Sequence, residues 1–241
     1  MTDQKVGDFV SQNIKTAHVF KKYGIDFCCG GGISLEEACR KKNLIPKNVL
    51  EELLQVKDGP EIGEDFANWS PDKLIDHILT VHHTYVLESL PKLISYSQKV
   101  AGVHGHHFGE LHAIKDLIQN LSEELLSHMK KEEVVLFPYI LNLLEMQAKG
   151  LQPKQPFVGS PIGMMKSEHE DAENLLKDLR ELSKDFTAPE SACNTYRALY
   201  DLLEEFESDL FQHIHLENNL LFPKALELES DLILRPSISE E

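Results

Sequence analysis

The chain has 241 residues, of which 41% are hydrophobic and 27% are charged, a balance typical of a soluble globular protein. Its formal net charge of −16 disfavours nucleic acids and anionic membrane surfaces as partners. No apolar run is long enough for a transmembrane helix and the start lacks the pattern of a signal peptide, so we expect a soluble cytoplasmic protein. The four cysteines form no recognisable disulfide framework, and we expect free thiols in a reducing compartment.

Residues 1–57 are predicted to form a small helical domain. Apolar residues near its start have helical spacing, and three consecutive glycines, Gly30–Gly32, interrupt the pattern. The sequence Ser34–Glu37 is typical of a capping box that opens a further helix. The composition of residues 58–69 then predicts a linker.

Four long helices are predicted after this linker. Ser70 followed by proline marks the start of the first helix. Helical periodicity favours helices near 71–98, 109–146, 160–184 and 190–226, and no strand pattern stands out. The predicted fold class is therefore all-α: an up-down four-helix bundle at 70–228, preceded by the small helical domain. Residues 229–241 are predicted to be an irregular acidic tail.

The second and fourth of these helices carry the same phrase, H-x-x-x-E-x-x-x-L-F-P, at residues 128–138 and 213–223. In both copies the histidine and the glutamate continue an apolar stripe with alternating steps of four and three residues, as on a buried helix face. Burying an unpartnered carboxylate costs on the order of several kcal/mol, so the two glutamates require something positive between them. A histidine at i and a glutamate at i+4 stand about 6 Å apart along the axis, which suits two ligands of one site.

The first and third helices add one inward histidine each. His83 belongs to a stripe that includes Leu87, and His169 to a stripe on the third helix, while the stripe of the second helix ends on Val135. The interval between the two lone histidines is 86 residues, and it is 85 both between the two histidines and between the two glutamates of the repeated phrase. This duplication predicts a site with pseudo-twofold symmetry.

Six such ligands exceed the four that a single zinc ion takes. Two carboxylates can bridge two ions, and imidazole with carboxylate in a helical bundle favours iron over manganese. The predicted cofactor is therefore a pair of iron ions. The predicted metal ligands are His83, His128, Glu132, His169, His213 and Glu217.

The pattern H…H-x-x-x-E…H…H-x-x-x-E resembles that of hemerythrin-like domains. The stretches FKKYGIDFCCGGG, SEHEDA and HIHLENNLLFP resemble the RIC (repair of iron centres) family of iron–sulfur cluster repair proteins, and the similarity covers nearly the whole chain except the acidic tail. The resemblance implies a cytoplasmic protein with a hemerythrin-like bundle. It also implies two non-haem iron ions held by the six ligands named above, with an oxo group and both glutamates as bridges.

For function, the resemblance implies repair of iron–sulfur clusters damaged by oxidative or nitrosative stress, through a supply of iron. Damaged iron–sulfur proteins would be the clients, and a homodimer is compatible with the family. Two alternatives stay open: a di-iron enzyme that reduces nitric oxide or peroxide, and a sensor or binding protein for oxygen or nitric oxide. The ligand set has fewer histidines than oxygen-carrying hemerythrins, which disfavours reversible oxygen carriage.

The adjacent Cys28 and Cys29 are the sharpest feature of the small domain. We expect the neighbouring glycines to expose the pair, which then serves as a thiol or iron relay or as a docking site for clients. Cys39 and Cys193 stand alone in the sequence, and we expect both to be packing residues.

Several residues near the predicted ligands are assigned other roles. Glu124 and Glu168 are candidate hydrogen-bond acceptors for a ligand imidazole. Glu133 lies about 140° around the helix from His128 and is expected to be solvated. The remaining assignments are His82 as a weaker alternative to His83, His77 as a packing or supporting residue, His215 as solvent-facing, and His104, His106 and His107 as members of a flexible loop.

Overall fold

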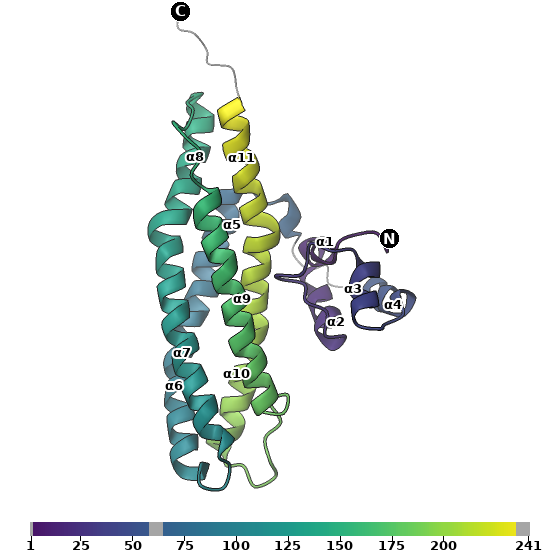
Figure 1. Cartoon of the computed structure of the whole chain (residues 1–241), viewed down its shortest axis with the longest axis vertical. Coiled ribbons are helices and arrows are strands. Elements are labelled where there is room, and N and C mark those ends of the chain that lie inside the picture. The colour runs from purple at the N-terminus through teal and green to yellow at the C-terminus, as the bar shows by residue number, and fades with distance from the viewer. Residues whose placement is uncertain (1, 58–64, 235–241) are drawn as a thin grey trace, which may run out of the picture. The chain divides into compact units, whose positions relative to one another are not determined.

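The computed structural model describes residues 2–57 and 65–234 (Figure 1). All regular elements in these ranges are helices, and one isolated antiparallel bridge joins Lys5 to Ser34. The chain divides into two compact units. The first unit comprises Met1–His77, Val135–Gly163 and Phe211–Glu241, and the second comprises Ile78–Val134 and Met164–Leu210.

The first unit begins with a group of short helices: α1 (Val6–Gln12), η1 (Ile14–Thr16), α2 (Ala17–Lys22), α3 (Leu35–Lys41) and α4 (Pro46–Lys57). The side chain of Ser34 accepts a hydrogen bond from the Glu37 backbone N–H at 3.2 Å, so α3 starts at the predicted cap. Phe20 and Leu35 are fully buried, and α3 packs against α4. Apolar burial between these helices therefore supports the loop that joins α2 to α3.

The rest of the first unit contains η2 (Phe66–Asn68), α5 (Pro71–His77), α8 (Phe137–Lys149), η5 (Glu217–Leu221) and α11 (Phe222–Leu234), with the first residues of α9 (Gly159–Leu182) and the last residues of α10 (Asn194–Leu216). Helix α8 packs against α5 and α11. The buried carboxylate of Glu229 on α11 accepts hydrogen bonds from the Tyr139 hydroxyl at 2.6 Å and from the Phe157 backbone N–H at 2.9 Å. This carboxylate ties the segment between α8 and α9 to α11.

The second unit contains η3 (Ile78–His83), α6 (Thr84–His104), α7 (Glu110–Lys131) and the first residues of η4 (Glu132–Leu136), with most of α9 and α10. Helices α6 and α7 follow one another in the chain and pack side by side (Figure 1). Between α9 and α10, the Arg180 guanidinium donates two hydrogen bonds to the buried Glu207 carboxylate, the first from Nε at 2.8 Å. The predicted long helices are thus present, and they form the frame that carries the predicted ligands.

Within residues 65–234, three π-helical segments interrupt the long helices at predicted ligands. Segment η3 ends at His83, η4 begins at Glu132 and η5 begins at Glu217. A π turn inserts one residue into the helical repeat and is frequent at functional sites. The insertion explains why Val135, predicted to be buried, is 44% exposed, while the next residue, Leu136, is 1% exposed.

Other predicted boundaries and burial also need correction. Leu87 is 51% exposed because the buried stripe steps three residues from His83, to Val86. Helix α6 extends to His104, which is therefore helical and not part of a loop. The predicted irregular tail from residue 229 is wrong as far as residue 234, because α11 continues there and buries Leu232 completely. Residues 58–64 of the predicted linker and 235–241 of the predicted tail lie outside the described residues.

No helix within the described ranges combines the length and the apolar character needed to cross a membrane.

Candidate metal centre

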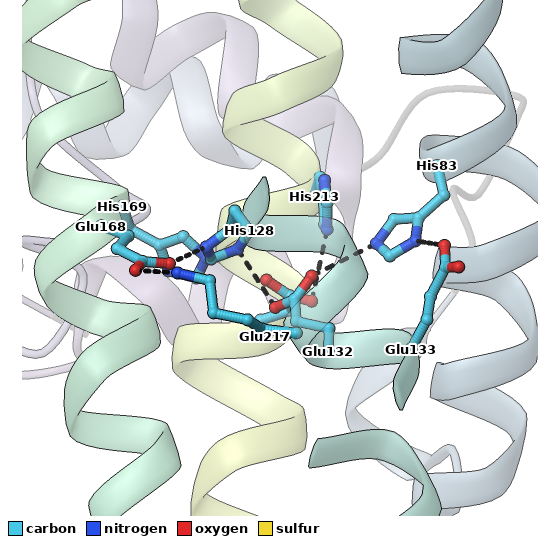
Figure 2. A network of polar contacts seen from close by, with 9 residues as sticks. His83, His128, Glu132, Glu133, Glu168, His169, His213 and Glu217 are labelled. Atoms are coloured by element: carbon cyan, nitrogen blue, oxygen red, sulfur yellow. Dashed lines mark hydrogen bonds and ion pairs between the residues drawn. The ribbon is translucent and has the colours of Figure 1, made fainter. Parts of the chain in front are cut away.

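Four of the six predicted ligands lie in the second unit, and three imidazoles there converge around one carboxylate. Glu132 is fully buried at the start of η4. Its Oε2 lies 3.3 Å from Nε2 of His83, and its Oε1 lies 3.2 Å from Nε2 of His128 (Figure 2). Nε2 of His169 in turn lies 3.1 Å from Nε2 of His128. The two oxygens of this buried carboxylate thus face two different imidazoles.

The outward nitrogens of two of these imidazoles meet carboxylates. Nδ1 of His83 lies 2.7 Å from Oε1 of Glu133, and Nδ1 of His128 lies 2.9 Å from Oε2 of Glu168 (Figure 2). Lys131 forms an ion pair with the other oxygen of Glu168. Burial raises the pKa of Glu168, but the hydrogen bonds from Lys131 and His128 outweigh this effect and lower its pKa below the ordinary value. Glu168 therefore stays ionised and fixes the ring of His128.

These contacts decide which nitrogen of each ring faces inward with a lone pair. In a neutral imidazole whose Nδ1 donates to a carboxylate, Nε2 presents a lone pair, and in His83 and His128 this nitrogen points inward. Each of these lone pairs faces an oxygen of Glu132, which is also an acceptor. Two acceptors at this distance repel unless a cation or a proton lies between them. The donor set therefore fits a metal ion, in the carboxylate–histidine–metal arrangement found at metal sites.

The other two predicted ligands lie in the first unit. Nε2 of His213 lies 3.2 Å from Oε1 of Glu217, and both side chains are almost completely buried. Within the second unit, His128, Glu132 and His169 form a buried group that could bind a metal, with their ligand atoms within 4.8 Å of one another.

Two carboxylates near the ligands differ from their predicted roles. Glu133 was expected to be solvated, but its carboxylate binds His83 although its side chain is 44% exposed. Glu133 lies in the π-helical segment η4, where a repeat of 3.6 residues no longer gives the direction of a side chain. Glu124 is exposed on α7, and the Nδ1 atom of His128 contacts Glu168 and not Glu124.

The remaining histidines of this region support the helices. His82 is buried, and its Nδ1 lies 2.9 Å from Oδ1 of Asp209. The His77 ring packs against Phe66 and Trp69, with ring centroids 5.1 Å and 5.3 Å apart. His77 is therefore a packing residue, one of the two roles predicted for it.

The cysteine pair lies on the loop between α2 and α3 and is wrapped around one carboxylate. Oδ1 of Asp26 accepts hydrogen bonds from the backbone N–H groups of Cys28 at 2.9 Å and Cys29 at 3.0 Å, and Oδ2 accepts one from Gly30 at 2.6 Å. Cys28 is buried and Cys29 is half-buried, and neither forms a disulfide. The expectation that the glycines expose both thiols is therefore wrong for Cys28, because the loop folds over its side chain.

The end of α10 and the start of η5 hold this loop. His215 is fully buried, with Nε2 3.2 Å from the Ser11 hydroxyl and Nδ1 3.2 Å from the Phe27 carbonyl oxygen. Asn219 donates a hydrogen bond to the Cys28 carbonyl at 2.8 Å, and Asn218 contacts the Cys29 sulfur at 3.4 Å. The prediction that His215 faces solvent is wrong, because the N-terminal helices cover this face. The two residues that follow the predicted ligand in η5 thus contact the cysteine loop directly.

The glycines of this loop are not equivalent, and a pair of alanine variants is expected to show it. A Cβ atom on Gly31 would lie 2.4 Å from the Phe27 carbonyl oxygen, whereas a Cβ atom on Gly32 has nothing within 4 Å. We expect Gly31→Ala to destabilise the first unit by about 1–3 kcal/mol, because backbone atoms must shift. Gly32→Ala should stay within about 0.5 kcal/mol of the original chain. Urea unfolding measures both, and equal stabilities would contradict the described loop.

The buried His215 predicts a specific dependence of stability on pH. Burial lowers the pKa of His215 from 6.5 to about 4, against a smaller opposite effect of the Phe27 carbonyl. Because the unfolded chain binds this proton more readily, the contribution is fully present above the ordinary pKa and is lost as pH falls from there toward the folded pKa. The free energy of unfolding should drop by about 2 kcal/mol more between about pH 7 and pH 5 than in His215→Gln. Urea unfolding of both metal-free chains tests this, and an equal loss in both would refute it.

Comparison with known proteins agrees with this geometry. The hemerythrin HHE cation binding domain matches residues 74–225, and ScdA_N, a domain of unknown function (DUF542), matches residues 2–57. The chain is 38% identical over 224 residues to the iron–sulfur cluster repair protein YtfE of Enterobacter sp. (strain 638). The aligned residues cover 93% of this chain and 97% of that protein. The proteins of the same name from Citrobacter koseri and Escherichia coli O17:K52:H18 are 37% and 36% identical over the same shares.

The hemerythrin match covers more than half of this all-α chain, and the ScdA_N match covers the small helical domain that precedes it. The similarity extends over both domains and not over the bundle alone. The chain therefore belongs to the family of iron–sulfur cluster repair proteins that join an ScdA_N domain to a hemerythrin HHE cation binding domain.

Proposed function

We propose that this chain repairs iron–sulfur clusters damaged by oxidative or nitrosative stress, in the cytoplasm, by supplying iron from a pair of non-haem iron ions. The observation that carries the proposal is the position of Glu132, a buried carboxylate whose two oxygens face the inward nitrogens of His83 and His128. The proposed ligands are His83, His128, Glu132, His169, His213 and Glu217, with both glutamates and an oxo group as bridges. The names of the relatives support the repair function.

The residues around these ligands support storage of an ion that can leave again. Glu168 is fixed by Lys131 and by His128, whereas Glu133 reaches His83 from a side chain that is 44% exposed. Carboxylate ligands shift between binding modes more easily than imidazoles, and two of the six ligands are carboxylates. Bound iron supplies a redox-active Lewis acid and the material for cluster repair. The chain's own side chains orient the ligands and keep the ions in a buried environment.

The cysteine loop is the proposed contact with the client. Cys29 is the accessible thiol of the pair, and Asn218 and Asn219 connect the loop to η5, directly after Glu217. We assign Cys28 and Cys29 a role as a thiol relay between the chain and damaged iron–sulfur proteins. Since Cys28 lies beneath the loop and contacts Asp26, Cys29 is the residue that meets the client first.

The decisive experiment combines metal analysis with a repair assay. The chain is loaded anaerobically with isotopically labelled iron and mixed with an iron–sulfur protein that nitric oxide or peroxide has damaged. We expect about two irons per chain, absorption bands of an oxo-bridged centre after exposure to air, and labelled iron in the repaired client. The controls are the same amount of free ferrous iron and the Glu132→Leu chain. Repair by free iron at the same rate, or a chain that binds zinc and no iron, would overturn the proposal.

A further inference from the structure

A second pair of reactive side chains lies in the second unit, at the ends of two helices. Sγ of Cys193 lies 3.3 Å from Nε2 of His104, the last residue of α6. Cys193 is exposed, although the sequence predicted a packing role for it. A thiol within hydrogen-bond distance of an imidazole is the arrangement of a nucleophile with its general base.

Cys193 is held in place by its backbone. It directly precedes α10, and its carbonyl oxygen accepts hydrogen bonds from the backbone N–H groups of Tyr196 at 3.0 Å and Arg197 at 3.1 Å. The Arg197 side chain donates to the Glu190 carbonyl at 2.9 Å, which closes the preceding turn onto the helix. The sulfur therefore sits at the start of a helix of 23 residues, where the helix dipole favours negative charge as it develops.

An aromatic neighbour of His104 lines a cavity. Tyr196, whose ring centroid is 5.7 Å from that of His104, also lines a cavity of about 220 Å³. The cavity walls include Phe108, Lys184 and Tyr200. The walls carry the carboxylate of Glu110 as well as the amine of Lys184, and neither Cys193 nor His104 lines them.

The other three cysteines lack this combination. The Cys28 thiol faces the carboxylate of Asp26 at 3.4 Å, which disfavours negative charge on its sulfur. Burial raises the pKa of Cys39. Cys29 is half-buried, and its sulfur contacts the side-chain amide of Asn218. The exposed Cys193 is the thiol that combines access to solvent with an adjacent imidazole.

We propose that Cys193 and His104 form a thiol-modification site that takes a low-molecular-weight disulfide such as glutathione disulfide. His104 accepts the thiol proton as the Cys193 sulfur attacks one sulfur of the disulfide. A new S–S bond forms and the old one breaks, and the leaving thiolate takes the proton back from His104. The products are one mixed disulfide on Cys193 and one free thiol, so the exchange needs no further oxidant. The site is separate from the ligands of the proposed iron centre and does not depend on iron.

The test incubates the full-length, iron-loaded chain with glutathione disulfide and follows each cysteine by peptide mass spectrometry over time. We expect Cys193 to be modified first and His104→Gln to slow its modification by at least about tenfold, since a general base is removed. Cys193→Ser should abolish this adduct while the other cysteines react as before. His106→Gln, which changes an exposed neighbour on the same turn, is the matched control and should leave the rate unchanged.

Two results would overturn the proposal. One is that Cys193 reacts at the same rate in the original chain and in His104→Gln, with both chains folded by circular dichroism. The other is that Cys28 or Cys29 is modified before Cys193. Iron content is measured on the same samples. The thiol site predicts modification with or without iron, so its failure can be distinguished from failure of the proposed iron-based function.

Discussion

Replacing Glu132 by leucine is expected to remove both metal ions from the chain and not only one. Each of the two oxygens of this carboxylate faces a different imidazole, Nε2 of His83 and Nε2 of His128. Loss of a single supporting contact at a metal site costs about 10- to 100-fold in affinity, so loss of a shared ligand should cost more than 100-fold at each ion. Metal analysis after anaerobic loading should therefore find almost no iron in Glu132→Leu.

A matched control lies on the preceding helix. Glu124→Leu makes the same change at an exposed position of α7, and this variant should keep its full iron content. A chain that loses one iron and retains the other in Glu132→Leu would show that Glu132 does not bridge. Equal iron content in the original chain and in Glu132→Leu would remove this residue from the ligand set altogether.

Glu132→Leu should also differ from the original chain in its stability, in a direction that an unfolded variant would not show. Without metal, the Glu132 carboxylate is a completely buried acid surrounded by other ligands. A buried carboxylate that no cation compensates costs on the order of several kcal/mol, so replacing it by an apolar side chain of similar volume removes this cost. Metal-free Glu132→Leu should therefore be at least as stable toward urea as the metal-free original chain. The combination of lost iron and retained stability identifies a metal ligand, whereas a structural role would lower both.

The residues of the candidate centre could be predicted from the sequence because a buried helix face has a regular spacing of apolar residues. Histidines and glutamates that continue an apolar stripe must lie among buried residues, and the duplicated spacing makes coincidence improbable. The structure buries all six residues. Their joint role as one di-iron centre stays a prediction until the metal is measured.

The same reasoning failed where the helical repeat itself changes. No local residue pattern predicts a π turn. Beyond such a turn, burial predicted from a repeat of 3.6 residues is assigned to the wrong residues. Val135 was therefore placed inside and Glu133 outside, although η4 exposes the first and brings the second to His83. His215 and Cys28 were missed for a different reason. Their burial depends on residues about 190 positions away in the chain, as the 3.2 Å contact between His215 and the Phe27 carbonyl shows.

The largest loss of stability is expected from Arg180→Ala, in the second unit. Arg180 donates two hydrogen bonds to Glu207, whose side chain is 2% exposed. The hydrogen bond to Glu207 raises the pKa of Arg180 above its ordinary value, despite an opposite effect of burial. Removing one partner of a buried ion pair leaves an uncompensated charge and costs about 3–5 kcal/mol. Urea unfolding of the metal-free chain should show a loss of this size.

Two further variants separate the buried pair from its surroundings. Asp185 also binds Arg180, at 3.1 Å, but its side chain is 79% exposed, so Asp185→Asn should change stability by less than about 1 kcal/mol. The double variant Arg180→Leu with Glu207→Leu removes both charges and should recover most of the loss, because neither group is left unpaired. A double variant as unstable as Arg180→Ala would mean that the pair contributes through packing and not through charge.

The Arg180–Glu207 ion pair lies on the same two helices as two of the predicted iron ligands. Arg180 and the predicted ligand His169 lie on the same helix, α9, and Glu207 and His213 both lie on α10. If the ligands bind iron as proposed, iron stabilises the folded chain over the unfolded one by an amount set by its concentration and affinity. Iron loading should then raise the unfolding midpoint of Arg180→Ala as it raises that of the original chain, while Glu132→Leu gains nothing. The ion pair and the metal would thus stabilise the same helices independently, so a variant that keeps its iron should keep its repair activity even when its metal-free form is marginally stable.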